Sequence, residues 1–233
     1  MKPNLVIICA SPNAIFQHWE NIDSYNFDTA VIIYHDQPIH KLDQVKYVEY
    51  SQGFKWRNIY NFIQKHDVSK YEYIWCLDDD CLVDPLTVEK IFEFCKEHDL
   101  DLAQPSLEHG SIFTYPWSLQ IPNAVMHITN MVEIMVPIFK QRIWKDCISQ
   151  LGNLPIGMGL GLEYFWMGAL DCNSGITKYG GKVAVIDQYS VRHIKPMNNV
   201  YNIDPWEDHR YLQTVTPGNP ANVIEIIEVI YAK

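Results

Sequence analysis

The sequence predicts an α/β protein with a doubly wound sheet. Short, continuous, β-branched runs recur along the first hundred residues, and segments with helical spacing separate them. Acidic or small polar residues stand within two positions of the end of each of the runs at 4–10, 29–34 and 73–77. In a sheet of this class the carboxyl ends of parallel strands meet at one edge, where ligands bind. We therefore expect these residues to converge on one site.

The first half of the chain reads as an alternation of strands and helices. Residues 4–10, NLVIICA, are apolar throughout, as buried parallel strands are, and Ser11 and Pro12 stop the run. Trp56, Ile59 and Ile63 fall at helical spacing. In order, the expected elements are a strand at 4–10, a short helix at 16–22, strands at 29–34 and 44–50, a helix ending at 66, a strand at 73–77 and a helix at 86–97.

The second half is less regular. In order, the expected elements are a strand at 101–106, a loop at 110–123, a strand-like stretch at 127–137, a helix at 139–151, a glycine-rich turn at 157–161 leading into a helix at 164–170, a strand at 183–187 and a short helix near 206–212. The apolar run at 223–231 suits either a helix or an edge strand, and its period does not decide between them.

Composition excludes some classes of protein. The net charge is -10 and the 18 lysines and arginines form no run, so we expect no nucleic-acid partner. No stretch approaches the roughly 18 apolar residues that a membrane span needs. The six cysteines lack zinc-type spacing, and four lie among apolar residues. With no signal peptide visible, we expect a cytoplasmic protein with reduced thiols.

Three consecutive aspartates, Asp78, Asp79 and Asp80, end the apolar run at 73–77. Carboxylates at a strand end repel one another and are costly to desolvate without a counter-charge, which a divalent cation supplies. Oxygen ligands suit Mg²⁺, Mn²⁺ or Ca²⁺. A solvated acidic turn is the alternative. A calcium loop starting at Asp78 is disfavoured, because Val83 stands where that loop needs glycine.

Weaker signals lie elsewhere. The turn at 157–161 lets backbone approach a ligand and sets Glu163 at a helix start, although a linker would look the same. His193 suits a late metal ligand or a surface residue. Lys55 and Arg57 open a helix and could bind an anion there, or be solvated. Aromatic side chains that could stack on sugars, or simply fill the core, are Tyr115, Trp117, Tyr164 and Trp166.

Taken in order, several stretches resemble the family known as domain of unknown function 707, a set of proteins grouped with the GT-A glycosyltransferases. They are YEYIWCLDDDCLV, LDLAQPSL, MVEIMVPIFKQRIW, GMGLGLEYFWMGAL and KVAVIDQYSVRHIKP, between residues 71 and 196. The Asp-x-Asp alone is a weak motif, and the ordered set is the specific one. The family has Asp in the glycine-rich block where this chain has Glu163.

The resemblance implies a GT-A fold with a mixed central sheet in one domain: a nucleotide-binding half at 1–100, an acceptor-binding half at 101–196 and a C-terminal extension at 197–233. It implies a nucleotide-diphosphate sugar donor, with UDP-sugar favoured, and Mn²⁺ or Mg²⁺ as the cofactor. The implied metal ligands are Asp78, Asp80 and His193. The implied donor contacts are Ala10, Ser11, Asp36, Lys55, Arg57, Asp78 and Asp79. The implied acceptor contacts are Glu133 and Glu163, and we add the aromatic candidates Trp117 and Trp166.

The expected function is metal-dependent transfer of a hexosyl or pentosyl group to a hydroxyl of a glycan or other acceptor. Two functions of other classes are alternatives to it. A sugar nucleotidyltransferase would use a similar sheet, but it usually has a glycine- and basic-rich loop where this chain has Ser11-Pro12-Asn13. A non-catalytic carbohydrate- or metal-binding module would tolerate loss of Glu163. If the enzyme inverts the anomeric centre, Glu163 is the candidate base; if it retains, Glu163 would orient the acceptor.

Overall fold

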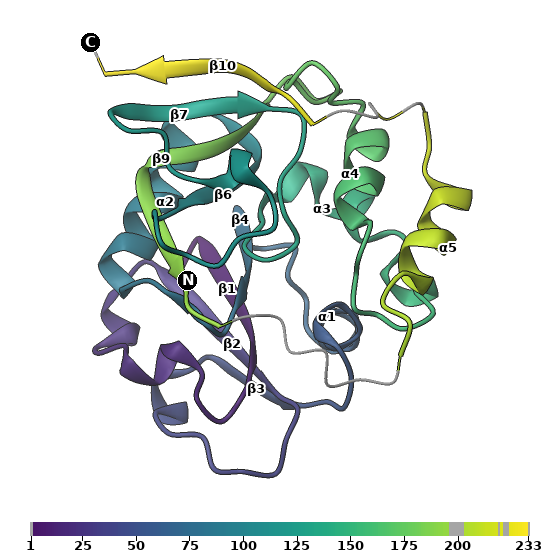
Figure 1. The fold of residues 1–233 in the computed structure, drawn as a ribbon. Coiled ribbons are helices and arrows are strands. Elements are labelled where there is room, and N and C mark those ends of the chain that lie inside the picture. The colour runs from purple at the N-terminus through teal and green to yellow at the C-terminus, as the bar shows by residue number, and fades with distance from the viewer. Residues whose placement is uncertain (1, 196–202, 219, 221–223, 233) are drawn as a thin grey trace.

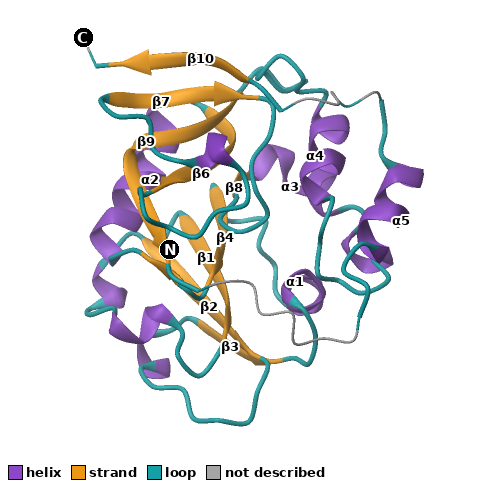
Figure 2. Cartoon of the chain, viewed as in Figure 1, coloured by secondary structure: helices purple, strands orange, loops and turns teal. Residues whose placement is uncertain are grey.

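A computed structural model describes residues 2–195, 203–218, 220 and 224–232. Its strands are β1 (Asn4–Ala10), β2 (Phe27–Ile33), β3 (Tyr47–Tyr50), β4 (Tyr73–Asp78), β5 (Cys81–Leu82), β6 (Leu100–Leu107), β7 (Ala124–Thr129), β8 (Ile138–Lys140), β9 (Lys182–His193) and β10 (Ile226–Tyr231). Its α-helices are α1 (Lys55–Lys65), α2 (Pro85–Glu97), α3 (Gln141–Ile148), α4 (Leu162–Leu170) and α5 (Glu207–Val215). Figure 1 shows this order in colour, and Figure 2 shows the helices flanking the sheet.

The sheet is mixed, and its strands lie in the order β10-β7-β9-β6-β8-β4-β1-β2-β3. Strands β4, β1, β2 and β3 run parallel to one another, as the continuous apolar runs predict. The short strand β8 lies antiparallel between β4 and β6 and joins the two halves of the sheet. Strand β9 runs parallel to β6. The predicted α/β sheet, with helices on both faces, is confirmed.

Two apolar cores lie on the two faces of the sheet. Helix α2 packs on one face with Val88, Ile91 and Phe92. Helices α1, α3 and α4 pack on the other, where Trp56 and Phe62 of α1 are buried. The sequence fixes the start of α2 locally, because the Asp84 carboxylate accepts a hydrogen bond from the Thr87 amide and Pro85 occupies the first turn.

Three expected elements differ from the structure. The helix expected at 16–22 is a single 3₁₀ turn, Ile15–His18. The strand expected at 127–137 ends at Thr129, and an irregular segment follows it to β8. The helix expected at 139–151 begins only at Gln141, because the residues before it are extended and pair with β4 and β6. Apolar composition alone does not distinguish a helix or strand from a 3₁₀ turn or an irregular buried segment.

The ambiguous final run is an edge strand, β10, antiparallel to β7. Val223, where that run was expected to begin, and residues 196–202 lie outside the described residues. In the part of the chain that the structure describes, no helix is long and apolar enough to cross a membrane. All six cysteines are free thiols, and Cys9 alone is not fully buried.

Candidate active site

The aspartates lie where the parallel strands end. Strand β4 finishes at Asp78, beside the end of β1, so that Cys9 and Asp78 are partners in register. The Ser11 amide donates a 2.5 Å hydrogen bond to the Asp79 carboxylate. The Ser11 hydroxyl is buried without a hydrogen-bond partner, which marks a place where a ligand group would complete the bonding.

Asp78 is paired with a lysine that also reaches another segment. The Lys55 ammonium lies 2.6 Å from the Asp78 carboxylate and donates to the carbonyls of Ile134 and Met135 at 2.8 Å each. Burial raises the pKa of Asp78 to about 6, although Lys55 opposes the shift. The lysine therefore acts as an internal counter-charge that ties the aspartates to the segment after β7.

His193 lies near the aspartates because the end of β9 extends beyond its last pair with β6. Its register with β6 shifts after Ile186, and its end pairs with β5, which places His193 opposite Cys81. His193 Nδ1 lies 2.7 Å from the Ile112 carbonyl, and Nε2 lies 3.5 Å from the Asp80 carboxylate. Since a carbonyl only accepts, Nδ1 carries the proton, and Nε2 faces Asp80.

This arrangement suits a divalent cation. A histidine that donates Nδ1–H to a carbonyl presents Nε2 as a metal ligand in the required tautomer. Among the described residues no group of three or more His, Cys, Asp or Glu is set up to hold a metal alone. Mg²⁺ and similar cations in nucleotide sites use one or two carboxylates and fill their shell with phosphate oxygens and water. Asp80 and His193 fit a cation that is held partly by the protein and partly by phosphate oxygens and water.

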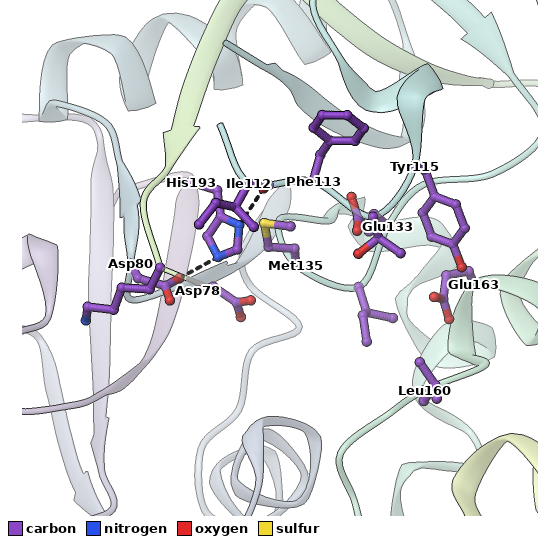
Figure 3. A pocket seen from close by; sticks show the side chains of 13 residues that line it. Asp78, Asp80, Ile112, Phe113, Tyr115, Glu133, Met135, Leu160, Glu163 and His193 are labelled. Atoms are coloured by element: carbon purple, nitrogen blue, oxygen red, sulfur yellow. Dashed lines mark hydrogen bonds and ion pairs between the residues drawn. The ribbon is translucent and has the colours of Figure 1, made fainter. Parts of the chain in front are cut away.

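Two cavities meet at Asp78. The first, of about 450 Å³, is lined by Tyr34, Gln52, Gly53, Phe54, Lys55, Asp79 and their neighbours Cys9 and Ile203. The second, of about 290 Å³, contains Asp80 and His193 at one end and Glu133, Glu163 and Tyr115 at the other (Figure 3). A ligand that crossed from one cavity to the other would pass the aspartates.

Two buried carboxylates line the second cavity. Glu163 is 2% exposed and accepts a hydrogen bond from the Gly161 amide at 2.9 Å. Glu133 is 3% exposed, and its Oε2 has no hydrogen-bond partner. Burial raises the pKa of both to about 7, and for Glu133 the charge of Glu163 adds to the rise. A carboxylate with a pKa near neutrality is suited to accept a proton from a hydroxyl.

The loop before Glu163 is held from two sides. On one side the amides of Trp56 and Arg57 donate to the Gly157 carbonyl at 3.0 Å. On the other, the fully buried Asp208 of α5 accepts hydrogen bonds from the amides of Ile156, Gly157 and Gly159, at 2.8, 3.2 and 2.8 Å. Asp208 thus fills a backbone anion nest and holds the loop that leads to Glu163.

The close approach of α5 explains one glycine of this loop. Gly161 has a φ of +97°, and a Cβ there would lie 2.6 Å from Nδ1 of His209. Any other residue would be strained and would push the helix away. The glycine-rich turn is therefore not a free linker, because it packs between α1 and α5.

Some candidate residues do not join the site. Trp166 is 1% exposed and packs against Trp56 and Phe139, so it is a core residue with no ring face for a sugar. Arg57 donates to the carbonyls of Gly152 and Leu154, and none of these three residues lines either cavity.

Three other candidates do not line the two cavities themselves. Asp36 is exposed beyond β2 and lines neither cavity. Ala10 is a buried strand residue that supports Ser11. Trp117 is half-buried and stacks on Tyr115, with ring centroids 5.6 Å apart. Trp117 therefore supports the cavity wall through Tyr115, which does line the cavity.

Several lining residues were missed at the sequence level. Tyr34 follows β2 directly, so the rule that ligands bind at strand ends could have identified it. Ile112, Phe113 and Leu160 lie in irregular segments, and apolar loop residues give no specific signal. Asp208 had no signal either, because an acid in a polar helix ordinarily faces solvent.

Comparison with known proteins bears on the fold. The first 349 residues of S. aureus TarS, solved with UDP-GlcNAc, match with a TM-score of 0.58 at 11% identity, over 93% of this chain and 65% of that one. GalNAc-T7, solved with UDP, GalNAc and Mn²⁺, matches with a TM-score of 0.58 at 11% identity, over 91% of this chain and 47% of that one. The protein has the GT-A glycosyltransferase fold. The chain spans less than two thirds of either of these proteins, and at such identities the likeness is one of fold alone.

A family model agrees with the resemblance in sequence. The model described as "Protein of unknown function (DUF707)" matches residues 17–131. That match contains the three aspartates and β6, whereas Glu163 and His193 lie beyond it. A search of curated proteins finds no significant match.

Proposed function

We propose that the protein is a metal-dependent glycosyltransferase, which moves a hexosyl or pentosyl group from a nucleotide-diphosphate sugar to a hydroxyl. The observation that carries this proposal is the meeting of two cavities at Asp78, one at the strand ends and one holding two buried carboxylates. A donor that lies across this junction would place its nucleoside in one cavity and its sugar in the other.

The donor would be a UDP-sugar, which is the kind of ligand named for the TarS structure. Its nucleoside would lie near Tyr34 and Ser11, with Asp79 toward the ribose or the sugar. Asp80 and His193, with Asp78 directly or through water, would hold Mn²⁺ or Mg²⁺. The cation would neutralise the leaving diphosphate as a Lewis acid. A cytoplasmic location belongs to the same proposal, since free buried thiols are typical of reducing compartments.

The chemical step uses residues of the chain as follows. The acceptor hydroxyl oxygen forms a bond to the anomeric carbon, and the bond from that carbon to the diphosphate oxygen breaks. The hydroxyl proton passes to Glu163, and the nucleoside diphosphate leaves with the electron pair. Glu163 lies at the end of the cavity away from Asp78 and Asp80 (Figure 3). Base and leaving group on opposite sides of the sugar support inversion of the anomeric centre.

Nucleotide binding tests the proposal directly. We expect UDP-sugars to raise the melting temperature when Mn²⁺ is present, and GDP- and dTDP-sugars to have smaller effects. The absence of any metal-dependent nucleotide binding would contradict the proposal. A non-catalytic binding module would bind the nucleotide and yield no transfer product, and a sugar nucleotidyltransferase would release pyrophosphate from a nucleoside triphosphate and a sugar phosphate.

A further inference from the structure

The cavity end that holds Glu133 and Glu163 has mostly apolar walls. Phe113, Tyr115, Ile134 and Leu160 surround the two carboxylates there (Figure 3 labels all but Ile134). Two cavity-lining side chains of the loop after β6 remain in contact with water, because Ile112 is 40% and Phe113 is 43% exposed. Exposed large apolar side chains beside a cavity are typical of a surface that binds an apolar ligand.

A saccharide acceptor does not suit the walls at this end of the cavity, which lies beyond the place proposed for the donor sugar. Each sugar carries several hydroxyls, and each hydroxyl that loses water without gaining a partner weakens binding by about tenfold. Among the described residues at this end, the polar side chains besides the two carboxylates are those of Thr114 and Tyr115, so a saccharide would find few partners for its hydroxyls. Aromatic rings can stack on sugars, but Ile134 and Leu160 are aliphatic, and one face of Tyr115 is covered by Trp117.

We infer that the acceptor is an alcohol whose hydroxyl is carried by an apolar aryl or alkyl body. This inference rests on the proposed transferase function and names the class of its acceptor. The hydroxyl donates its hydrogen bond to Glu163, which is the polar group that the reaction requires. The apolar body contacts Leu160 and Phe113 and extends toward the exposed edge of the cavity.

Glu133 adds a second constraint on this acceptor. Its Oε2 is buried without a partner and lines the same cavity. No arginine or lysine forms an ion pair with Glu133 or Glu163 among the residues that the structure describes. An acceptor that carries a carboxylate or phosphate next to its hydroxyl would be repelled here, so the alcohol is uncharged near its reacting end.

A matched pair of probes tests the inference. 2-Phenylethanol and methyl glucoside are titrated by calorimetry into the full-length protein, with and without UDP and Mn²⁺. We expect 2-phenylethanol to bind at least tenfold more tightly than methyl glucoside. Phe113→Ser removes an exposed ring and should weaken 2-phenylethanol binding about tenfold, with an unchanged melting temperature showing that the variant folds.

Leu86→Ser is the control. Leu86 is a comparably exposed apolar residue, at 46%, on α2 and outside both cavities, so its loss should not change the affinity for 2-phenylethanol. Tighter binding of methyl glucoside, or an unchanged affinity in Phe113→Ser, would overturn the inference. Binding of 2-phenylethanol without any binding of UDP and Mn²⁺ would overturn the transferase function, yet still assign an apolar alcohol to this cavity.

Discussion

The two cavities that meet at Asp78 are built in different ways. The larger one lies at the ends of β1, β2 and β4, three adjacent parallel strands close together in the chain. The smaller one is assembled from irregular segments around Ile112, Glu133 and Leu160, and from the far end of β9. Apart from Ile203, the lining of the first comes from the strand ends and from the segment that leads from β3 into α1. The second exists only when long-range contacts hold the loops.

This difference separates the two tasks of the proposed enzyme. A rigid sheet edge is suited to a constant ligand such as a nucleotide, whereas loops can be replaced without disturbing the sheet. Changes on the acceptor side should therefore affect turnover and leave nucleotide binding intact. Changes at the aspartates should affect both.

The largest effect is expected for Glu163→Gln. Glutamine keeps the size of the side chain but cannot take the hydroxyl proton, so kcat should fall about 10³-fold. The affinity for UDP in the presence of Mn²⁺, measured by calorimetry, should stay within about twofold of the wild type. A variant that keeps a tenth or more of the wild-type kcat would show that Glu163 is not the base.

The next largest effect is expected for Asp80→Asn, which tests the proposed metal site where the two cavities meet. Losing one carboxylate of the metal site should weaken UDP binding in Mn²⁺ by about 10- to 100-fold. In EDTA the variant and the wild type should bind UDP alike, because the carboxylate acts through the cation. An equal loss of affinity with and without the metal would contradict the assignment.

A smaller effect is expected for Asp208→Asn, which tests how the loop before Glu163 is held. The amide group of asparagine replaces one acceptor oxygen with a donor, so hydrogen bonds to the loop amides are lost. We expect kcat to fall about tenfold, with little change in UDP affinity. Asp204→Asn is the control, since Asp204 is exposed and its partners among the described residues, Trp206 and Arg210, belong to its own segment.

The smallest effect concerns stability and pH. The pKa of Glu133 is raised by burial, and further by Glu163, from 4.5 to about 7. Between these values the folded protein holds a proton that the unfolded chain has released, so stability should fall as the pH rises through this window. Glu133→Gln should flatten the curve of melting temperature against pH and raise the melting temperature at pH 8 by roughly 2–4 °C. A variant curve that parallels the wild type would contradict this.

The contrast between the cavities also explains what could be predicted from the sequence. Asp78, Asp79 and Ser11 follow continuous apolar runs, and strand periodicity is a local property that places them at one edge. The pairing of β5 with β9 joins segments more than a hundred residues apart, so no local pattern could show that His193 meets Asp80. Trp166 was misread because α4 is apolar on nearly all sides, which favours burial over ligand contact.

The hydrogen bonds between Asp208 and the glycine-rich loop have a consequence for the order in which the site forms during synthesis. Ribosomes extend a chain from its amino end, so β1 to β4, which end at the aspartates, can begin to form while the rest is still being synthesised. Glu163 emerges before His193, Ile203 and Asp208, which belong to the proposed metal site, the nucleotide cavity and the support of its loop. Donor binding and catalysis would thus both wait for segments made after Glu163, and the docking of α5 would complete the site.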